Sequence, residues 1–142
     1  MAASDVTACP SCGTRNRVPK VAQGVPRCAS CKAALPWLVE ADEGDFTEVA
    51  ADRLPVLVDL WADWCGPCRL IAPAVEQASR DLAGRLKVVK VDVDRSPGIS
   101  ARYGVQGIPT LLVLRDGREV DRQVGASGAD ALLAWVRAAV DA

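Results

Sequence analysis

The stretch Val56–Cys68 reads Val-Leu-Val-Asp-Leu-Trp-Ala-Asp-Trp-Cys-Gly-Pro-Cys, and it decides the fold. Its first half is a nearly continuous apolar run, the pattern of a strand buried on both faces. After Pro67, apolar residues recur at helical spacing, which predicts a helix that starts at the Cys-x-x-Cys motif. Backbone N–H groups and the helix dipole favour negative charge there. We therefore expect a redox site in which the thiol of Cys65 ionises more readily than a free cysteine.

The rest of the chain alternates between strand and helix patterns. The expected strands are 37–40, 86–93, 110–114 and 120–124, with a tight hairpin at Asp116-Gly117 before the last one. The expected helices are 45–51, the segment after Cys68, 99–103, and a final helix opened by a capping box at 127–130. This order predicts an α/β fold with a mixed central sheet and helices on both of its faces.

Two further Cys-x-x-Cys pairs precede this pattern, Cys9 with Cys12 and Cys28 with Cys31. Zinc binds four ligands at tetrahedral angles, and each short turn presents two thiolates from one side. Because four cysteines leave no open position, the spacing predicts a structural zinc ion in a small ribbon over residues 1–34. A segment this short needs such a staple to fold. Two disulfides, or four unligated thiols, remain open as alternatives at this point.

The composition limits the kinds of function. The 142 residues carry a net charge of −1 and include no histidine, which excludes Cys-His and Ser-His nucleophile pairs and any mixed Cys/His zinc site. No stretch is long and apolar enough to span a bilayer, and the first residues lack the features of a signal peptide. We therefore expect a cytoplasmic protein whose six cysteines serve metal binding and catalysis rather than a disulfide framework.

The two thiols of the central motif are expected to have different tasks. Cys65 lies nearer the helix start and should be the more exposed thiol, so we assign it the attack on a target disulfide. Cys68, one turn further on, should be more buried and should resolve the mixed disulfide. A buried structural dithiol is the alternative. Gly66 and Pro67 place no charge beside the thiolate, which favours a comparatively strong reductant.

Asp59 interrupts the apolar strand. A carboxyl buried without a partner costs several kcal/mol or has a raised pKa. A pKa near neutrality suits a general base that takes the proton of the second thiol. The alternative is an aspartate at a strand end that faces solvent.

The segment Trp61–Arg69 resembles the active-site signature of the thioredoxin family. Lys90 after two valines, Ile108-Pro109-Thr110, Asp116-Gly117 and Gly125 stand where that family has its other marks. The resemblance covers about residues 36–142. Together with the preceding cysteine pairs, the chain resembles the thioredoxin-2 type of bacteria, which carries an N-terminal zinc ribbon. The expected architecture is therefore a thioredoxin fold in residues 35–142, preceded by the ribbon.

The resemblance also implies roles for single residues. Asp59 would serve Cys68 through water, with Lys90 modulating its charge, although a lysine on a strand can simply extend to solvent. Pro109 would form a cis bond with Ile108 against the disulfide, where the alternative is a proline that opens a strand. A flat apolar surface for an extended substrate segment would consist of Trp64, Gly66, Pro67, Ile108 and Gly125. Trp61 would support the site from below, whereas Trp37 and Trp135 are expected only to pack.

The function implied by the resemblance is that of a protein-disulfide reductase. It would act on disulfide-containing client proteins, be recycled by an NADPH-dependent thioredoxin reductase, and use no organic cofactor of its own. A zinc-dependent redox sensor or chaperone on the same frame is the first alternative. The second is a nucleic-acid-binding ribbon, because residues 1–35 are basic, but this segment has no aromatic side chain for base stacking. We expect a monomer without nucleic-acid or membrane partners, although the edge strand 120–124 leaves dimerisation open.

Overall fold

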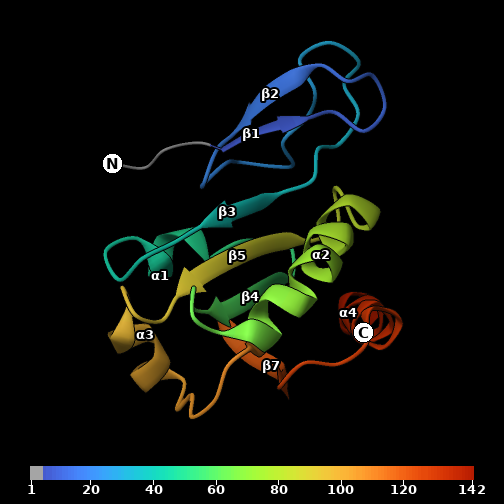
Figure 1. Cartoon of the computed structure of the whole chain (residues 1–142). Coiled ribbons are helices and arrows are strands. Elements are labelled where there is room, and N and C mark those ends of the chain that lie inside the picture. Colours follow the sequence, from blue (N-terminus) through green and yellow to red (C-terminus); the bar gives the residue numbers. More distant parts are fainter. Residues whose placement is uncertain (1–4) are drawn as a thin grey trace.

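The computed structural model describes residues 5–142, which form a two-stranded and a five-stranded sheet with four helices (Figure 1). The strands are β1 (Asp5–Ala8), β2 (Arg15–Val18), β3 (Leu38–Glu40), β4 (Val56–Trp61), β5 (Lys87–Asp92), β6 (Thr110–Arg115) and β7 (Arg118–Val124). The helices are α1 (Phe46–Val49), α2 (Gly66–Asp81), α3 (Pro97–Arg102) and α4 (Ala129–Asp141). Among the described residues, no helix combines the length and apolar character that crossing a membrane requires.

The five-stranded sheet has the order β3-β5-β4-β6-β7. Strands β3, β5 and β4 run parallel, whereas β6 and β7 join as antiparallel neighbours. The predicted mixed sheet is therefore confirmed, and β7 is the expected edge strand. The turn before β7 is also as predicted, because Asp116 and Gly117 both have positive φ, the conformation that a two-residue hairpin turn requires.

The two faces of β4 enter different hydrophobic cores. Val58 and Leu60 pack in a cluster with α1 and α3 side chains, and Leu57 packs in a second cluster with residues of α2 and α4. Because side chains alternate along a strand, Asp59 points to the same face as Leu57, towards α2. The central strand thus places its single carboxyl on the side of the sheet that carries the Cys-x-x-Cys motif.

The start of α4 differs from the expectation. Its N-cap is Gly128, which makes no side-chain capping bond. Ser127 lies one position too early to cap the helix, and its hydroxyl instead accepts a hydrogen bond from the amide of Gln123 at 2.6 Å. The predicted capping box is therefore wrong, because a contact with β7 takes the serine that the sequence pattern assigned to the helix.

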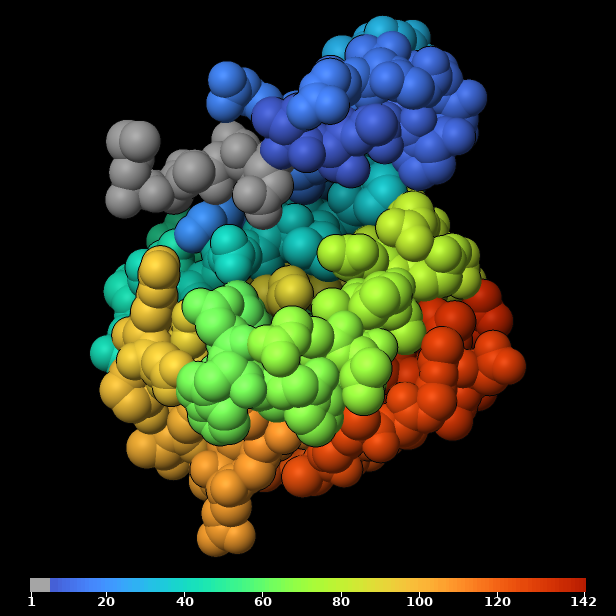
Figure 2. Space-filling model, viewed as in Figure 1, coloured from blue at the N-terminus to red at the C-terminus, as the bar shows by residue number. Residues whose placement is uncertain are grey.

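Residues 5–34, called the N-terminal lobe below, form the hairpin of β1 and β2 followed by a loop that returns to the main sheet (Figure 1). In the space-filling view the lobe sits on the β3 side of the molecule (Figure 2). The indole N–H of Trp37 donates to the carbonyl of Pro19 at 2.8 Å, and Lys20 forms a 3.0 Å ion pair with Asp45. Trp37 therefore does more than pack, because it binds the backbone of the lobe to the start of β3.

Candidate active site and metal centre

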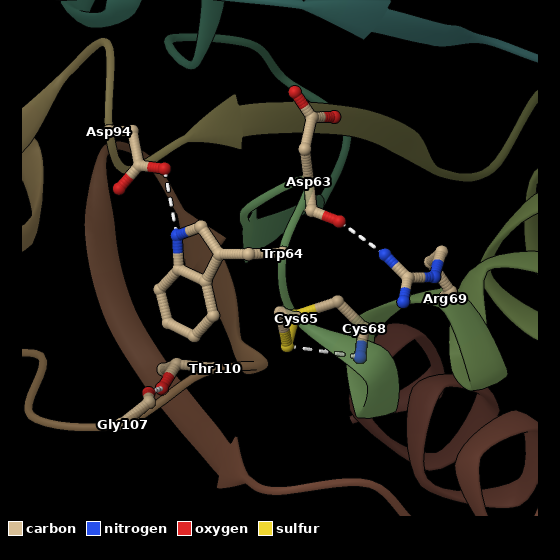
Figure 3. Close-up of a disulfide and its surroundings, with 8 residues drawn as sticks. All are labelled: Asp63, Trp64, Cys65, Cys68, Arg69, Asp94, Gly107 and Thr110. Carbon is tan, nitrogen blue, oxygen red and sulfur yellow. Dashed lines mark hydrogen bonds between the residues drawn. A yellow bond between two sulfur atoms is a disulfide. The ribbon is translucent and has the colours of Figure 1, made fainter.

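Cys65 and Cys68 form a disulfide at the start of α2, with their Cα atoms 5.3 Å apart (Figure 3). Cys65 is the N-cap residue of this helix, and its sulfur accepts a hydrogen bond from the backbone N–H of Cys68 at 3.2 Å. A free N–H at a helix start stabilises negative charge on the atom that it faces. The local geometry therefore favours the thiolate form of Cys65 once the disulfide is reduced.

The expected difference in exposure between the two cysteines is wrong for the disulfide form. The exposed fraction is 3% for Cys65 and 4% for Cys68, so both are buried. The two sulfurs form a small apolar cluster with Ala62, and Ile108 packs against this cluster from the loop before β6. Because that loop lies far along the chain from the start of α2, the helix pattern alone gave no sign that it packs on the disulfide.

Asp59 is buried in the middle of the sheet. Its exposed fraction is 2%, and it lies in register with Lys90 of β5 and Leu111 of β6. One carboxylate oxygen, Oδ1, has no hydrogen-bond partner among the described residues. Burial raises the pKa of Asp59 to about 6, and the positive charge of Lys90 offsets part of that rise. The expected burial is confirmed, and the alternative of a carboxyl facing solvent is excluded.

Lys90 is half-buried beside Asp59 and also contacts Trp61. Its ammonium lies 5.0 Å from the centroid of the Trp61 ring. Both side chains line a cavity of about 510 Å³ between β1 and α2, which Figure 2 shows as a hollow between the teal and green segments. Lys90 can therefore reach water while its charge still acts on Asp59. The ring of Trp61 lies against the disulfide cluster, as expected for a supporting residue.

The surface around the disulfide is apolar and exposed. Trp64 is 67% exposed, and its indole N–H donates to Asp94 at 2.8 Å, which fixes the ring beside the disulfide (Figure 3). Trp64 and Ile108 line the same shallow groove of about 210 Å³. Asp94 was not identified from the sequence. The only signal for it was an acidic residue just after a strand, which is common in turns without any function.

The peptide bond between Ile108 and Pro109 is cis, as the resemblance implied. The carbonyl of Pro109 accepts a hydrogen bond from the N–H of Gly125 at 2.8 Å, so the ends of β6 and β7 are joined at this point. Gly66 and Pro67 form the first turn of α2 directly beside the sulfurs. Ile108, Gly66 and Pro67 therefore lie beside the sulfurs, and Gly125 is joined to this region through Pro109.

The four cysteines of the N-terminal lobe lie together at one end of its hairpin. Their sulfur atoms all lie within 4.8 Å of one another, and none of the four is in a disulfide. A zinc ion with Zn–S bonds of about 2.3 Å places its four sulfurs roughly 3.8 Å apart, so the cluster has the right dimensions. The alternative of two disulfides does not describe this structure. The arrangement is compatible with a closed four-thiolate metal site.

The two cysteine turns have nearly the same backbone geometry. In each, the residue four positions after the first cysteine has positive φ and returns a hydrogen bond to that cysteine's carbonyl: Gly13 to Cys9 at 2.8 Å, and Lys32 to Cys28 at 3.0 Å. Glycine adopts this conformation freely, whereas lysine adopts it at a cost. The second turn is therefore held in a less favourable conformation.

Asn16 connects the two cysteine turns and was missed from the sequence. Its side-chain oxygen Oδ1 accepts from the N–H of Ala29, and its side-chain Nδ2 donates to the backbone carbonyl of Thr14, both at 2.9 Å. The same amide lies 3.5 Å from the sulfur of Cys28. The sequence held one signal for this role. Asn16 stands between Arg15 and Arg17 on a strand, so if the arginines face solvent, the Asn16 side chain must point into the lobe.

Comparison with known proteins agrees with this geometry. The model of the family described as Thioredoxin matches residues 38–138, so the N-terminal lobe lies outside the match. A thioredoxin of Rickettsia felis is 39% identical over 93 residues, which cover 66% of this chain and 89% of the relative. Thioredoxin 1 of Synechococcus elongatus is 48% identical over 79 residues, which cover 56% of this chain and 74% of the relative.

A solved structure shows the same fold. A mutant thioredoxin from Halobacterium salinarum superposes with a TM-score of 0.67 at 34% sequence identity, covering 75% of this chain and 93% of that one. These similarities favour an oxidoreductase over a zinc-dependent sensor or chaperone. The chain belongs to the thioredoxin family and is a thiol-disulfide oxidoreductase.

Proposed function

We propose that this oxidoreductase works as a reductant of protein disulfides, with Cys65 as the nucleophile and Cys68 as the resolving thiol. The observation that carries the proposal is the position of the Cys65 sulfur at the helix N-cap, where it accepts the N–H of Cys68. That contact lowers the energy of the Cys65 thiolate specifically. The uncharged Gly66-Pro67 pair adds no cation that would turn the site into an oxidant.

The reaction is two successive exchanges. The Cys65 thiolate attacks one sulfur of the client disulfide, forms a mixed disulfide, and releases the other client sulfur as a thiolate that takes up a proton. Cys68 then loses its proton and attacks the Cys65 sulfur, which releases the second client thiol and forms the Cys65–Cys68 disulfide. Two electrons pass from the dithiol to the client in one cycle.

Asp59 acts in this scheme as the general base for Cys68, through a water molecule. Its raised pKa and its unpartnered oxygen on the α2 side of the sheet support this role. Lys90 modulates the charge of Asp59 from the neighbouring strand, which the register of the two residues supports. Both groups act on the second exchange, because the first needs only the Cys65 thiolate.

Client proteins bind in extended form on the apolar surface around the disulfide. Trp64 and Ile108 supply side-chain contact, Pro109 lies against the sulfurs, and Gly66, Pro67 and Gly125 leave the backbone accessible. The cis geometry at Pro109 and its bond to Gly125 support this arrangement. Because few side chains read the client sequence, the substrate range is broad.

The oxidised form is returned to the dithiol by a flavoprotein thioredoxin reductase that uses NADPH. The N-terminal lobe belongs to a zinc-ribbon domain of residues 1–34, held by a structural zinc on Cys9, Cys12, Cys28 and Cys31, and the thioredoxin domain spans residues 35–142. Four thiolates fill the coordination shell, so the zinc supplies folding energy to the lobe and no step of the exchange. The protein acts as a monomer in the cytoplasm and binds no nucleic acid.

The decisive test is the reduction potential of the Cys65–Cys68 pair in the zinc-loaded protein, measured by equilibration with a dithiol buffer. We expect a value well below that of the cytosolic glutathione pool. NADPH oxidation by thioredoxin reductase, coupled to reduction of a disulfide client, should then depend on the protein. A potential at or above the glutathione pool contradicts the proposal and indicates an oxidant or isomerase.

A further inference from the structure

Three neighbouring parallel strands end at the edge of the sheet where β4 leads into the disulfide segment, and a carboxylate lies at or just after each end. Glu40 is the last residue of β3 and Asp92 the last of β5, while Asp63 follows β4 by two residues. Because β3, β5 and β4 are parallel neighbours, their carboxyl ends meet at one edge, which is where α/β sheets bind ligands. This edge forms a cleft of about 470 Å³, and all three acids line it.

The cleft also contains polar groups without partners. Ser96 is 1% exposed and lines the cleft, and its hydroxyl makes no hydrogen bond to any described residue. Trp61 lines it too, and its indole N–H is likewise buried and unpartnered. Buried polar groups are normally satisfied, so these two point to an occupant that can both donate and accept hydrogen bonds.

The charge of the cleft is negative. Lys20 is committed to Asp45 at 3.0 Å, and Arg95 lies 3.8 Å from Asp92 with 85% of its side chain exposed, so it neutralises that acid weakly. Glu40 and Asp63 have no ion-pair partner within residues 5–142. The lining holds four acids, Asp42 among them, against Lys20 and Arg95, so the cleft is negative on balance.

The position of Asp63 connects the cleft to the redox site. Asp63 stands two residues before Cys65, and Arg69 of α2 donates to its backbone carbonyl. In Figure 3 its carboxylate points away from Cys65 and Cys68 while its backbone runs directly into the disulfide segment. The cleft therefore adjoins the segment that carries the disulfide, on the side away from the sulfurs.

We propose that this cleft binds a lysine or arginine side chain of the client protein, close in space to the disulfide under attack. The proposal rests on the disulfide-reductase function above. The client's cation meets Glu40 and Asp63, the Ser96 hydroxyl accepts one of its N–H groups, and the Trp61 N–H donates to a client carbonyl. A bare metal ion fits less well, because the four cysteines are the only group within residues 5–142 whose ligand atoms gather closely enough to hold one.

The test uses three disulfide peptides that differ only in the residues flanking the disulfide, which are two lysines, two glutamates or two serines. The readout is kcat/KM in the coupled assay at low ionic strength. For the wild type we expect the lysine peptide to exceed the serine peptide on the order of fivefold, since close charge complementarity raises the association rate. This preference should disappear in the double variant Glu40→Gln, Asp63→Asn.

The matched control removes two exposed acids elsewhere, Glu48 of α1 and Asp130 of α4, as Glu48→Gln, Asp130→Asn. It has the same net charge as the test variant and should keep the lysine preference. The proposal is overturned if the control loses the preference equally, if the test variant keeps it, or if the wild type reduces all three peptides alike. Failure of the wild type to reduce even the serine peptide would instead overturn the proposed function.

Discussion

The ammonium of Lys87 lies 4.3 Å from the centroid of the Trp37 ring, in the interior between the N-terminal lobe and the main sheet. It donates to the carbonyl of Lys20 in the lobe at 2.5 Å and to the carbonyl of Val49 in α1 at 2.6 Å. Trp37 itself donates to Pro19. One fully buried lysine thus ties the lobe to the domain that carries the disulfide.

Replacing this lysine should weaken the whole protein. Lys87→Met keeps the aliphatic stem but leaves the buried carbonyl of Val49 and the part-buried carbonyl of Lys20 without donors. Each loss costs about 1–3 kcal/mol, with the part-buried group at the lower end. We expect the free energy of unfolding in urea to fall by about 2–4 kcal/mol. Lys90→Met, compared at about pH 4, is the matched control, because Lys90 is on the same strand and also lies over a tryptophan ring but makes no comparable buried hydrogen bonds. At that pH Asp59 is protonated in the folded protein, so loss of the Lys90 charge adds no cost of its own. An equal loss in both variants would contradict the interpretation.

Asp59 gives the fold a pH dependence with a defined sign. Its pKa is raised to about 6 from 3.8, so between about pH 4 and pH 6 the folded protein holds a proton that the unfolded chain has released. The free energy of unfolding therefore falls as the pH rises through this window. Above about pH 6 the full cost of burying the ionised Asp59 carboxylate persists. Asp59→Asn should raise the free energy of unfolding at pH 7 by about 2–3 kcal/mol.

The measurement is urea unfolding of Asp59→Asn and the wild type from about pH 3.5 to about pH 8. The gain of the variant should vanish below about pH 4, where both states of the wild type are protonated. Asp130→Asn, at an exposed position, should show no such window. The Asp59 variant should also resolve mixed disulfides more slowly above about pH 6 while forming them at the normal rate. A slower first exchange would argue against the role assigned to Asp59.

The order of the two exchanges can be tested by trapping. With a disulfide peptide, Cys68→Ser should accumulate one covalently bound peptide per chain, because the mixed disulfide on Cys65 cannot be resolved. Cys65→Ser should bind little peptide on the same timescale. Mass spectrometry of the intact protein distinguishes the two results. Since both cysteines are equally buried in the disulfide form, preferential trapping on Cys68 would show that burial, and not the helix N-cap, decides which thiol attacks.

The apolar pattern of residues 56–60 was enough to predict a buried central strand, and the helical spacing after Pro67 was enough to predict the helix at the motif. It could not predict what distant segments do to single side chains. Lys87 stands at the start of an apolar run and gave no sign of burial, because the ring and carbonyls around it come from Trp37, Lys20 and Val49. The covering of Cys65 by the loop before β6 was missed for the same reason. Local periodicity fixes which face a residue points to, but the burial of that face depends on tertiary packing.

The metal centre gives the last prediction. The protein as purified should contain one zinc ion per chain, and Asn16→Ala should lower zinc affinity about 10- to 100-fold, the usual effect of removing a side chain that orients the ligands. Asn16 bonds to both cysteine turns and contacts the Cys28 sulfur, so its loss lets the turns separate without removing a ligand. Affinity is measured by competition with a chromophoric chelator. Ser11→Ala, an exposed change within the first turn, should leave affinity unchanged, and an equal loss there would show that Asn16 has no special part in holding the two turns together.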